Sequence, residues 1–235
     1  MAVLWQVLFL RCLGAPVEWA PAVLLFLTVW LIYAADRLLD ARSGRSGLPR
    51  HEFYRRHFVA MSAACGLVLA TLVALVVSGA ADPLLVRGFG MLVAVLLYLA
   101  CVHGRAANQL GVKEASVAVL FAMGTSLPAW NSIRSFTDIA TVVLFSALCW
   151  LNCIAIEQWE TGPRHWPVSL LALVTACAGL VMLHRERPIL SGAIGVSLLA
   201  IVLLDWMRAR FSRDALRVLA DAALLTPLLF LPIVR

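Results

Sequence analysis

FTDIATVVLFSALCWLNCIAIEQ (residues 136–158) is a mostly apolar run. It is long enough to cross a lipid bilayer as one helix, because a spanning helix needs about 20 mostly apolar residues. Other segments share this character, although the first of them is short and ends at Gly14-Ala15-Pro16. The sequence therefore predicts an all-α integral membrane protein with nine candidate transmembrane helices, at approximately 2–15, 20–40, 57–79, 84–103, 112–130, 136–158, 166–183, 188–206 and 214–232.

The overall composition agrees with this fold class. Of the 235 residues, 63% are hydrophobic and 14% are charged, whereas roughly 45–50% of the residues of an ordinary soluble domain are apolar. No linker is long enough to separate two domains, so residues 1–235 are predicted to form a single domain. The opening MAVLWQVLFLRCLG lacks a basic n-region and a small-residue cleavage site, so we expect a short first helix rather than a removable signal peptide.

The distribution of positive charge predicts the orientation in the membrane. The charges lie in connections between apolar runs, where they report topology rather than a nucleic-acid-binding face. The positive-inside rule favours a multi-pass protein of the cell (inner) membrane with a cytoplasmic N-terminus. The predicted cytoplasmic set is Arg37, Arg42, Arg45, Arg50, Arg55, Arg56, Arg105, Lys113, Arg164, Arg208, Arg210, Arg213 and Arg217, the opposite set is Arg87, Arg134, Arg185, Arg187 and Arg235, and Arg11 lies within the first segment.

Two pairs of acids close two of the long apolar segments on the predicted cytoplasmic side. Asp36 and Asp40 end the second segment in IYAADRLLDARSGR, and Glu157 and Glu160 end the sixth in LNCIAIEQWETGP. Spacings of four and three residues place both members of a pair on one helix face. Two carboxylates one turn apart on the same helix face repel each other unless a cation lies between them.

Each pair is either a metal site or a solvated helix end that neighbouring arginines neutralise, such as Arg37 and Arg42 for the first pair and Arg164 for the second. Magnesium is the metal that fits, because it prefers carboxylate and phosphate oxygens and keeps several waters. The basic loop RSGRSGLPRHEFYRRH, directly after the first pair, favours the metal site. Carboxylates, a divalent cation, phosphate and guanidinium groups together balance charge around a bound diphosphate.

The two acid pairs and their places in the chain resemble the UbiA superfamily of intramembrane prenyltransferases. Its members have nine transmembrane helices, with N-D-x-x-D-x-x-x-D closing helix 2 and typically D-x-x-x-D closing helix 6. In register, Asp36 and Asp40 match the second and third aspartates of the first motif, and Ile32-Tyr33 replace its Asn-Asp. In the second motif, NCIAIEQWE offers Asn152, Glu157 and Glu160 in place of the usual aspartates.

The resemblance implies a UbiA-like bundle with a central cavity open to the cytoplasm. It also implies Mg²⁺-dependent transfer of an isoprenyl group from an allylic prenyl diphosphate to a lipophilic, often aromatic, acceptor. Metal and basic side chains would stabilise the departing diphosphate most in the transition state. The implied catalytic and metal-binding residues are Asp36, Asp40, Glu157 and Glu160, and the implied diphosphate-binding residues are Arg42, Arg50, Arg56, Lys113, Asn152 and Arg164.

Aromatic rings near the same helix ends could stabilise the allylic carbocation through cation–π attraction. They could equally lie there because Trp and Tyr gather at membrane interfaces. Lys113 has two interpretations as well, as a phosphate ligand or as an interfacial lysine beside Glu114. The candidates for the prenyl and acceptor pocket are Trp30, Tyr33, Phe121, Trp150 and Trp159.

Three other functional interpretations stay open at this point. The incomplete motifs also fit a non-catalytic relative that binds a prenyl lipid or a membrane-protein partner. DRLLDAR is faintly similar to the signature of CDP-alcohol phosphotransferases, but the further aspartates of that signature are absent. Asp221 could be the relay acid of a proton-coupled transporter, although no internal repeat supports that class. We expect Asp221 to pair with Arg217, because an unpaired charge at the membrane centre costs roughly 2.5–3.5 kcal/mol.

Overall fold

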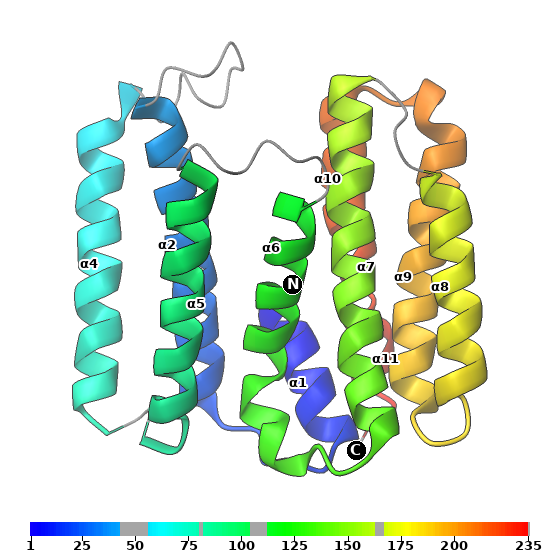
Figure 1. Cartoon of the computed structure of the whole chain (residues 1–235), viewed down its shortest axis with the longest axis horizontal. Helices are drawn as coiled ribbons and strands as arrows, with labels where there is room; N and C mark the ends of the chain where they lie inside the picture. Colours follow the sequence, from blue (N-terminus) through cyan, green and yellow to red (C-terminus); the bar gives the residue numbers. More distant parts are fainter. Residues whose placement is uncertain (43–55, 80–81, 104–111, 163–166, 235) are drawn as a thin grey trace. The chain divides into compact units, whose positions relative to one another are not determined.

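The computed structural model describes residues 1–42, 56–79, 82–103, 112–162 and 167–234, and it describes 40–42, 83, 102–103 and 112 by their backbone alone. Within these ranges the secondary structure is helical and contains no strand (Figure 1). Each predicted segment coincides with a helix or a pair of helices, so the prediction of an all-α protein is confirmed. The elements are α1 (Ala2–Cys12), α2 (Trp19–Arg42), α4 (Phe58–Val77), η1 (Asp82–Leu84), α5 (Leu85–His103), α6 (Val112–Ser126), η2 (Leu127–Ser132), α7 (Phe136–Thr161), α8 (Val168–Leu183), α9 (Pro188–Met207), η3 (Arg208–Arg210), α10 (Arg213–Ala223) and α11 (Pro227–Phe230).

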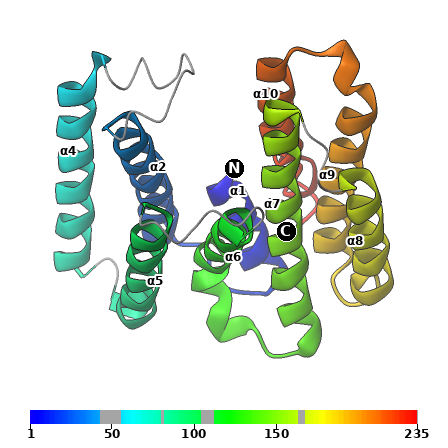
Figure 2. The ribbon, with the colours of Figure 1, turned by 45° about the horizontal axis from the view of Figure 1, so that its top comes forward.

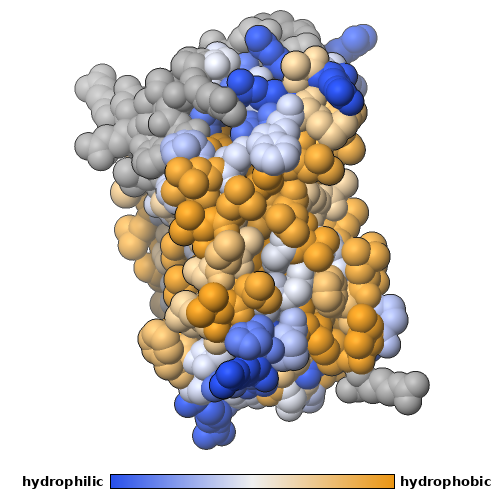
Figure 3. Space-filling view, turned by 90° about the vertical axis from the view of Figure 1, so that its right-hand side faces the viewer, coloured by the Kyte–Doolittle hydropathy of each residue, from blue (hydrophilic) through white to orange (hydrophobic). Residues whose placement is uncertain are grey.

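Several of these helices have the length and composition of membrane spans. On the side formed by α8 and α9, hydrophobic residues make a band between hydrophilic ends (Figure 3). These are the features of a helical membrane protein. Among the described helices, the four that are long and apolar enough to cross a bilayer cover Trp19–Leu39, Phe58–Val77, Phe136–Thr161 and Pro188–Arg210, and three shorter apolar helices cover Ala2–Cys12, Leu85–Cys101 and Val168–Leu183.

The chain divides into two compact units. Unit 1 consists of Met1–Val17 and Asn108–Arg235, and it contains α1 and α6 to α11. Unit 2 consists of Glu18–Ala107 and contains α2, α4 and α5. Each unit is described by itself below, and the organisation of residues 1–235 as one domain stays a prediction.

An aromatic cluster lies at the centre of unit 1. The Phe145 ring of α7 packs against Trp5 and Phe9 of α1, with ring centroids 4.5 and 5.3 Å apart, and all three side chains are completely buried. Large aromatic side chains of this kind bury roughly 150–250 Å² each and dominate the energetics of a core. Around this cluster α7 contacts α6, α8, α9 and α10, and α8 runs beside α9 in both ribbon views (Figures 1 and 2). The helix that carries the second acid pair is therefore the central helix of unit 1.

The last predicted segment, 214–232, is not one continuous helix, and this prediction is corrected. α10 ends at Ala223 and α11 begins at Pro227. Proline has no backbone N–H, and in a continuous helix its ring would clash with the Ala223 carbonyl. The break leaves the Leu224 carbonyl available to Trp5, whose indole Nε1 donates a hydrogen bond to it at 2.9 Å in the buried core. The ninth predicted segment is thus helical but consists of two short helices rather than one.

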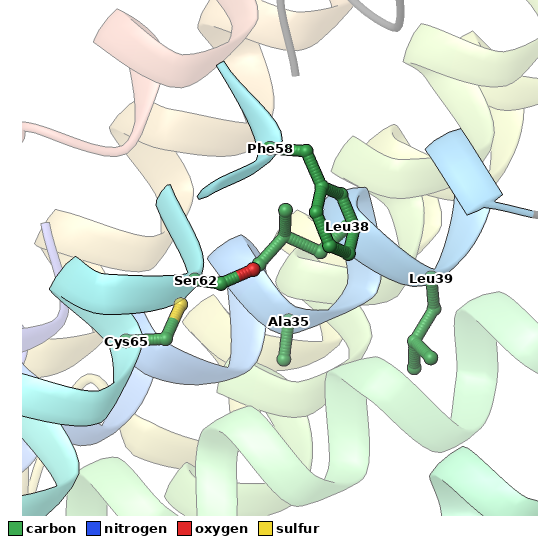
Figure 4. Close-up of a pocket in the computed structure, with 6 residues that line it drawn as sticks. All are labelled: Ala35, Leu38, Leu39, Phe58, Ser62 and Cys65. Carbon is green, nitrogen blue, oxygen red and sulfur yellow. The ribbon is translucent and has the colours of Figure 1, made fainter. Parts of the chain in front are cut away.

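In unit 2, α2 and α4 pack against each other and leave a small open groove between them (Figure 4). No side chain of α4 is buried, and Val59 and Val77 each expose 81% of their surface. A helix that is apolar on all sides and buries none of its side chains within the protein is typical of a membrane span. The groove is lined by Ala35, Leu38, Leu39, Phe58, Ser62 and Cys65.

Candidate functional site

The second predicted acid pair lies in the last two turns of α7. The helix ends just beyond it at Gly162, whose φ of +89° is a conformation that residues with a side chain rarely adopt. Arg217 of α10 places its Nη1 3.5 Å from the Glu160 Oε1, and the two side chains are 26% and 29% exposed. A pair of this length and exposure contributes only about 0–1 kcal/mol. Glu160 therefore has a nearby but loosely held cationic neighbour.

Glu157 has a different set of neighbours. Its carboxylate, that of Glu114 in α6 and that of Asp221 in α10 all lie close enough to the Cys153 thiol for their charges to act on it. Carboxylates from three helices of unit 1 thus lie within electrostatic range of one position on α7. Like charges that gather in this way repel, and a cation or bound protons would relieve the repulsion.

The predicted ion pair between Arg217 and Asp221 is wrong. The Arg217 guanidinium contacts Glu160 of α7 instead, and Asp221 forms no salt bridge with it. The physical reason is helix packing: α10 packs against α7, which places the Arg217 guanidinium beside Glu160. The positive charge that acts on Asp221 is that of the N-terminal amino group, although burial raises the pKa of its carboxyl more than this charge lowers it.

Asn152 lies on α7 five positions before Glu157 and is buried. Its Oδ1 atom has no hydrogen-bond partner within the described part of the chain. An unsatisfied buried polar atom costs about 1–3 kcal/mol, which a bound group would recover. Because the orphaned atom is an acceptor, it suits a cation or a cation-bound water better than a phosphate oxygen.

An acid that the sequence analysis did not single out stabilises this end of unit 1. Asp205, near the end of α9, is buried and accepts a hydrogen bond from Trp159 Nε1 at 3.1 Å and another from the Ser169 hydroxyl. Arg208 lies 3.8 Å from the same carboxylate. Since Trp159 stands between the two glutamates of the pair, Asp205 fixes the turn that carries them. Its place inside the apolar segment 188–206 is the signal that could have identified it, because an acid in such a run needs a partner.

A second acidic network that the sequence analysis missed lies at the other end of α7. Asp138 is 1% exposed, and its Oδ2 accepts hydrogen bonds from the backbone N–H groups of Arg134 and Ser135, both at 3.0 Å. Its Oδ1 accepts from Arg187 Nε at 2.8 Å and Nη2 at 2.7 Å, and Arg187 Nη1 donates to the Cys12 carbonyl at 3.0 Å. The capping-box spacing of Ser135 and Asp138 was the available sequence signal. Because every group is satisfied, this network is structural.

The first predicted acid pair lies at the end of α2, in unit 2. Asp36 is partly buried, and the side chain of Asp40 lies outside the described residues. Next to Asp36, the Arg37 guanidinium carbon lies 5.0 Å from the centroid of the Tyr33 ring. That distance allows a cation–π contact. The two pairs belong to different units, so their convergence on one metal stays a prediction.

The predicted diphosphate-binding cations are only partly described. Arg56 is exposed just before α4, and Lys113 is partly exposed in the first turn of α6, next to Glu114. The side chain of Arg42 and the whole of Arg50 and Arg164 lie outside the described residues. Of these cations, Lys113 alone is placed by the structure beside one of the gathered acids of unit 1.

The predicted aromatic residues divide between the two units. In unit 1, Phe121 packs with its ring centroid 6.2 Å from that of Phe145 and so belongs to the aromatic core. Trp159 is buried and bonded to Asp205, and Trp150 is partly buried on α7. Trp30 and Tyr33 lie on α2 in unit 2. A shared prenyl or acceptor pocket stays a prediction.

Within the ranges that the structure describes, no group of three or more His, Cys, Asp and Glu side chains could hold a metal ion. The donor types still suit magnesium, because the candidate ligands are carboxylates and Asn152 Oδ1 is an unpartnered oxygen. A magnesium site would need ligands beyond those that any one described group provides.

Comparison with models of protein families, with curated proteins and with solved structures gives no match to this chain. The resemblance to the UbiA superfamily therefore rests on the sequence motifs, and it stays a prediction.

Proposed function

We propose that this chain transfers an isoprenyl group from an allylic prenyl diphosphate to a lipophilic, aromatic acceptor within the membrane. The observation that carries the proposal is that carboxylates on three helices, those of Glu114 on α6, Glu157 on α7 and Asp221 on α10, lie within electrostatic range of one position on α7, Cys153. The resemblance to the UbiA superfamily assigns the acids that close α2, Asp36 and Asp40, to the same reaction. The similarity of both acid pairs to the UbiA motifs supports the same assignment.

Magnesium, held by Asp36, Asp40, Glu157 and Glu160, would neutralise charge on the diphosphate as it leaves. Lys113, in the first turn of α6, would bind a phosphate oxygen as a point charge. Asn152 would offer its orphaned Oδ1 to the cation or its water shell. These roles leave the chain's own residues to orient the leaving group, so that transfer begins from a fixed geometry.

The carbocation that forms must be kept from water and stabilised. Trp159 is suited to this role, because its indole is buried and Asp205 fixes its orientation. Trp150 lies more than two turns earlier on the same helix and offers a second ring. An aromatic face attracts a cation, and the attraction grows when water is excluded.

We place this end of unit 1 on the cytoplasmic side of the cell membrane, with a cytoplasmic N-terminus. The support is the excess of lysine and arginine on that side of the predicted topology. Soluble prenyl diphosphates would then reach the acids without crossing the bilayer.

A second candidate function is a non-catalytic protein that binds a prenyl lipid or a membrane partner. One observation favours it: Ile32-Tyr33 stand where the first UbiA motif has Asn-Asp, and glutamates stand where the second has aspartates. Such a protein would bind a prenyl diphosphate and release no product.

The test uses the purified full chain in lipid nanodiscs with Mg²⁺, a prenyl diphosphate and an aromatic acceptor. Asp36→Ala and Glu157→Gln are each expected to slow diphosphate release on the order of 100-fold or more, as loss of transition-state stabilisation does. The matched control is Glu186→Gln, an exposed acid in the turn between α8 and α9. Unchanged turnover in both acid variants would remove these residues from the mechanism, and binding without any prenylated product would support the second candidate.

A further inference from the structure

The turn between α9 and α10 is rich in arginine, and only part of that charge is neutralised within the protein. Two of the side chains contact acids of unit 1 at 3.5 and 3.8 Å. Arg210 and Arg213 are exposed, and neither forms an ion pair with any residue that the structure describes. Within the described part of the chain, these two guanidinium groups are thus exposed and form no ion pair. The full set is Arg208, Arg210, Arg213 and Arg217.

Aromatic side chains accompany these arginines at the end of a membrane span. Trp206, in the last turn of α9, exposes 72% of its surface, and Phe211 follows η3 and is also exposed. The apolar span ends at Arg210, so the turn lies at the end of a helix that is long and apolar enough to cross a membrane. Exposed Trp rings gather at this depth of a bilayer, where ring and headgroup lie at the same level.

The local structure keeps the arginines on the outer surface. The 3₁₀ turn η3 is followed by Ser212, whose Oγ accepts a hydrogen bond from the Ala215 N–H and starts α10. α10 buries Leu216 and Ala220 against unit 1, so its opposite face is exposed. Asp214, next to Arg213, lies in the first turn of α10, where a negative charge is stabilised by the helix dipole.

We propose that the turn formed by residues 206–213 binds the headgroup of an anionic phospholipid. Guanidinium groups bind phosphate through paired hydrogen bonds, and basic side chains near a membrane surface are attracted to anionic lipid. The exposed rings of Trp206 and Phe211 favour a lipid over a soluble phosphate ion. A lipid would contact the rings with its glycerol and acyl region, whereas a soluble ion would make no favourable contact with them. This interaction is independent of the proposed transferase activity.

The opposite end of unit 1 offers a matched control. There Arg187 is held by Asp138 and the Cys12 carbonyl, and Arg11 donates to two backbone carbonyls. Arg134 and Arg185 are exposed but lie on separate turns. They equal the proposed pair in charge and number but are not brought together by one turn.

The test measures the unfolding midpoint of the full chain in a neutral detergent while phosphatidylglycerol, phosphatidylcholine or inorganic phosphate is added. A ligand that binds the folded state raises the unfolding midpoint, and the dependence of the midpoint on ligand concentration gives the dissociation constant. We expect phosphatidylglycerol to raise the midpoint and the other two to have little effect. Arg210→Gln with Arg213→Gln should weaken the phosphatidylglycerol response about tenfold or more, while Arg134→Gln with Arg185→Gln should change it less than about twofold.

The outcomes distinguish a lipid bound at this turn from a soluble anion and from a general effect of positive charge. An unchanged response in the Arg210 and Arg213 variant, or an equal loss in the control variant, would overturn the proposal. Saturation by inorganic phosphate at similar concentrations would assign the turn to a soluble anion and also overturn it. If the variant does not fold, the wild-type response decides: it should weaken steadily with added NaCl, because exposed charges are screened, and a salt-independent response would contradict the proposal.

Discussion

The two ends of α7 hold their acids in opposite ways. At the start of the helix, both oxygens of Asp138 are hydrogen-bonded at 2.7–3.0 Å, and its cationic partner Arg187 belongs to the turn before α9. At the end, Glu160 lies 3.5 Å from Arg217, and Glu157 shares its surroundings with two further carboxylates. The same helix thus begins in a short, buried hydrogen-bond network and ends in a longer, more exposed ion pair, with other carboxylates within electrostatic range.

The difference separates a structural role from a candidate functional one. A buried polar network in which every group is satisfied makes a fold specific and leaves no capacity for a ligand. The contact of Glu160 with Arg217 is longer and partly exposed and contributes little, so a bound cation could replace that contact. The comparison predicts that substitutions at the start of α7 act on stability, and that substitutions at its end act mainly on function.

The largest effect is expected from Asp138→Ala. The substitution leaves Arg187 without its carboxylate and two backbone N–H groups without their acceptor. We therefore expect the free energy of unfolding to fall by about 3–5 kcal/mol. The measurement is the free energy of unfolding in detergent, followed by helical circular dichroism. Glu186→Ala, an exposed acid in the same turn as Arg187, should stay within about 0.5 kcal/mol of the wild type. A shift for Asp138→Ala no larger than that of this control would contradict the structural role.

A smaller effect is expected from Asp205, which connects α9 to the end of α7. Asp205→Ala removes the acceptor for Trp159 Nε1 and for Ser169, which should cost about 2 kcal/mol, since hydrogen bonds to a charged group contribute about 1.5–3 kcal/mol. Asp205→Asn keeps one acceptor oxygen for the indole and should cost less. The double substitution with Trp159→Phe tests the contact directly, because the two single losses should not add. Additive losses would show that the hydrogen bond between them contributes nothing.

Much of the fold could be predicted from the sequence, because apolar length is a local property. The run 136–158 coincides with α7, and the other segments also fall on helices. The ninth segment fails for a local reason that the sequence contains, since Pro227 interrupts it. A prediction from apolar length alone does not take the helix-breaking effect of that proline into account.

The candidate site was harder to predict, because its partners come from different helices. Spacing along one helix places Arg217 one turn from Asp221, and it says nothing of Glu160 on α7, to which the guanidinium extends. Asp138 and Asp205 were missed for the same reason, since Arg187 lies 49 positions from Asp138 in the chain and Trp159 lies 46 positions from Asp205. Only the packing of the helices shows which acids have cationic or hydrogen-bonding partners on another helix.

The smallest effect on stability is expected at Glu160 and Arg217, whose contact best distinguishes the end of α7 from its start. Both side chains are more than a quarter exposed and 3.5 Å apart, so Glu160→Gln and Arg217→Gln should each change the free energy of unfolding by only about 0–1 kcal/mol. If the end of α7 holds a metal-bound diphosphate, Glu160→Gln should still slow diphosphate release by roughly tenfold or more, the factor that about 1.4 kcal/mol of lost transition-state stabilisation produces.

Arg217→Gln separates the two roles that Glu160 could have. It removes the cation that competes for the carboxylate, so magnesium should activate this variant at a lower concentration than the wild type, whereas Glu160→Gln should require more magnesium. The measurement is the magnesium dependence of diphosphate release for the two variants side by side. If Glu160 binds magnesium, the two substitutions should shift the activating magnesium concentration in opposite directions. Equal shifts in the same direction would make this end of α7 a structural contact like the Asp138 network. Losses of turnover that only follow the losses of stability would lead to the same conclusion.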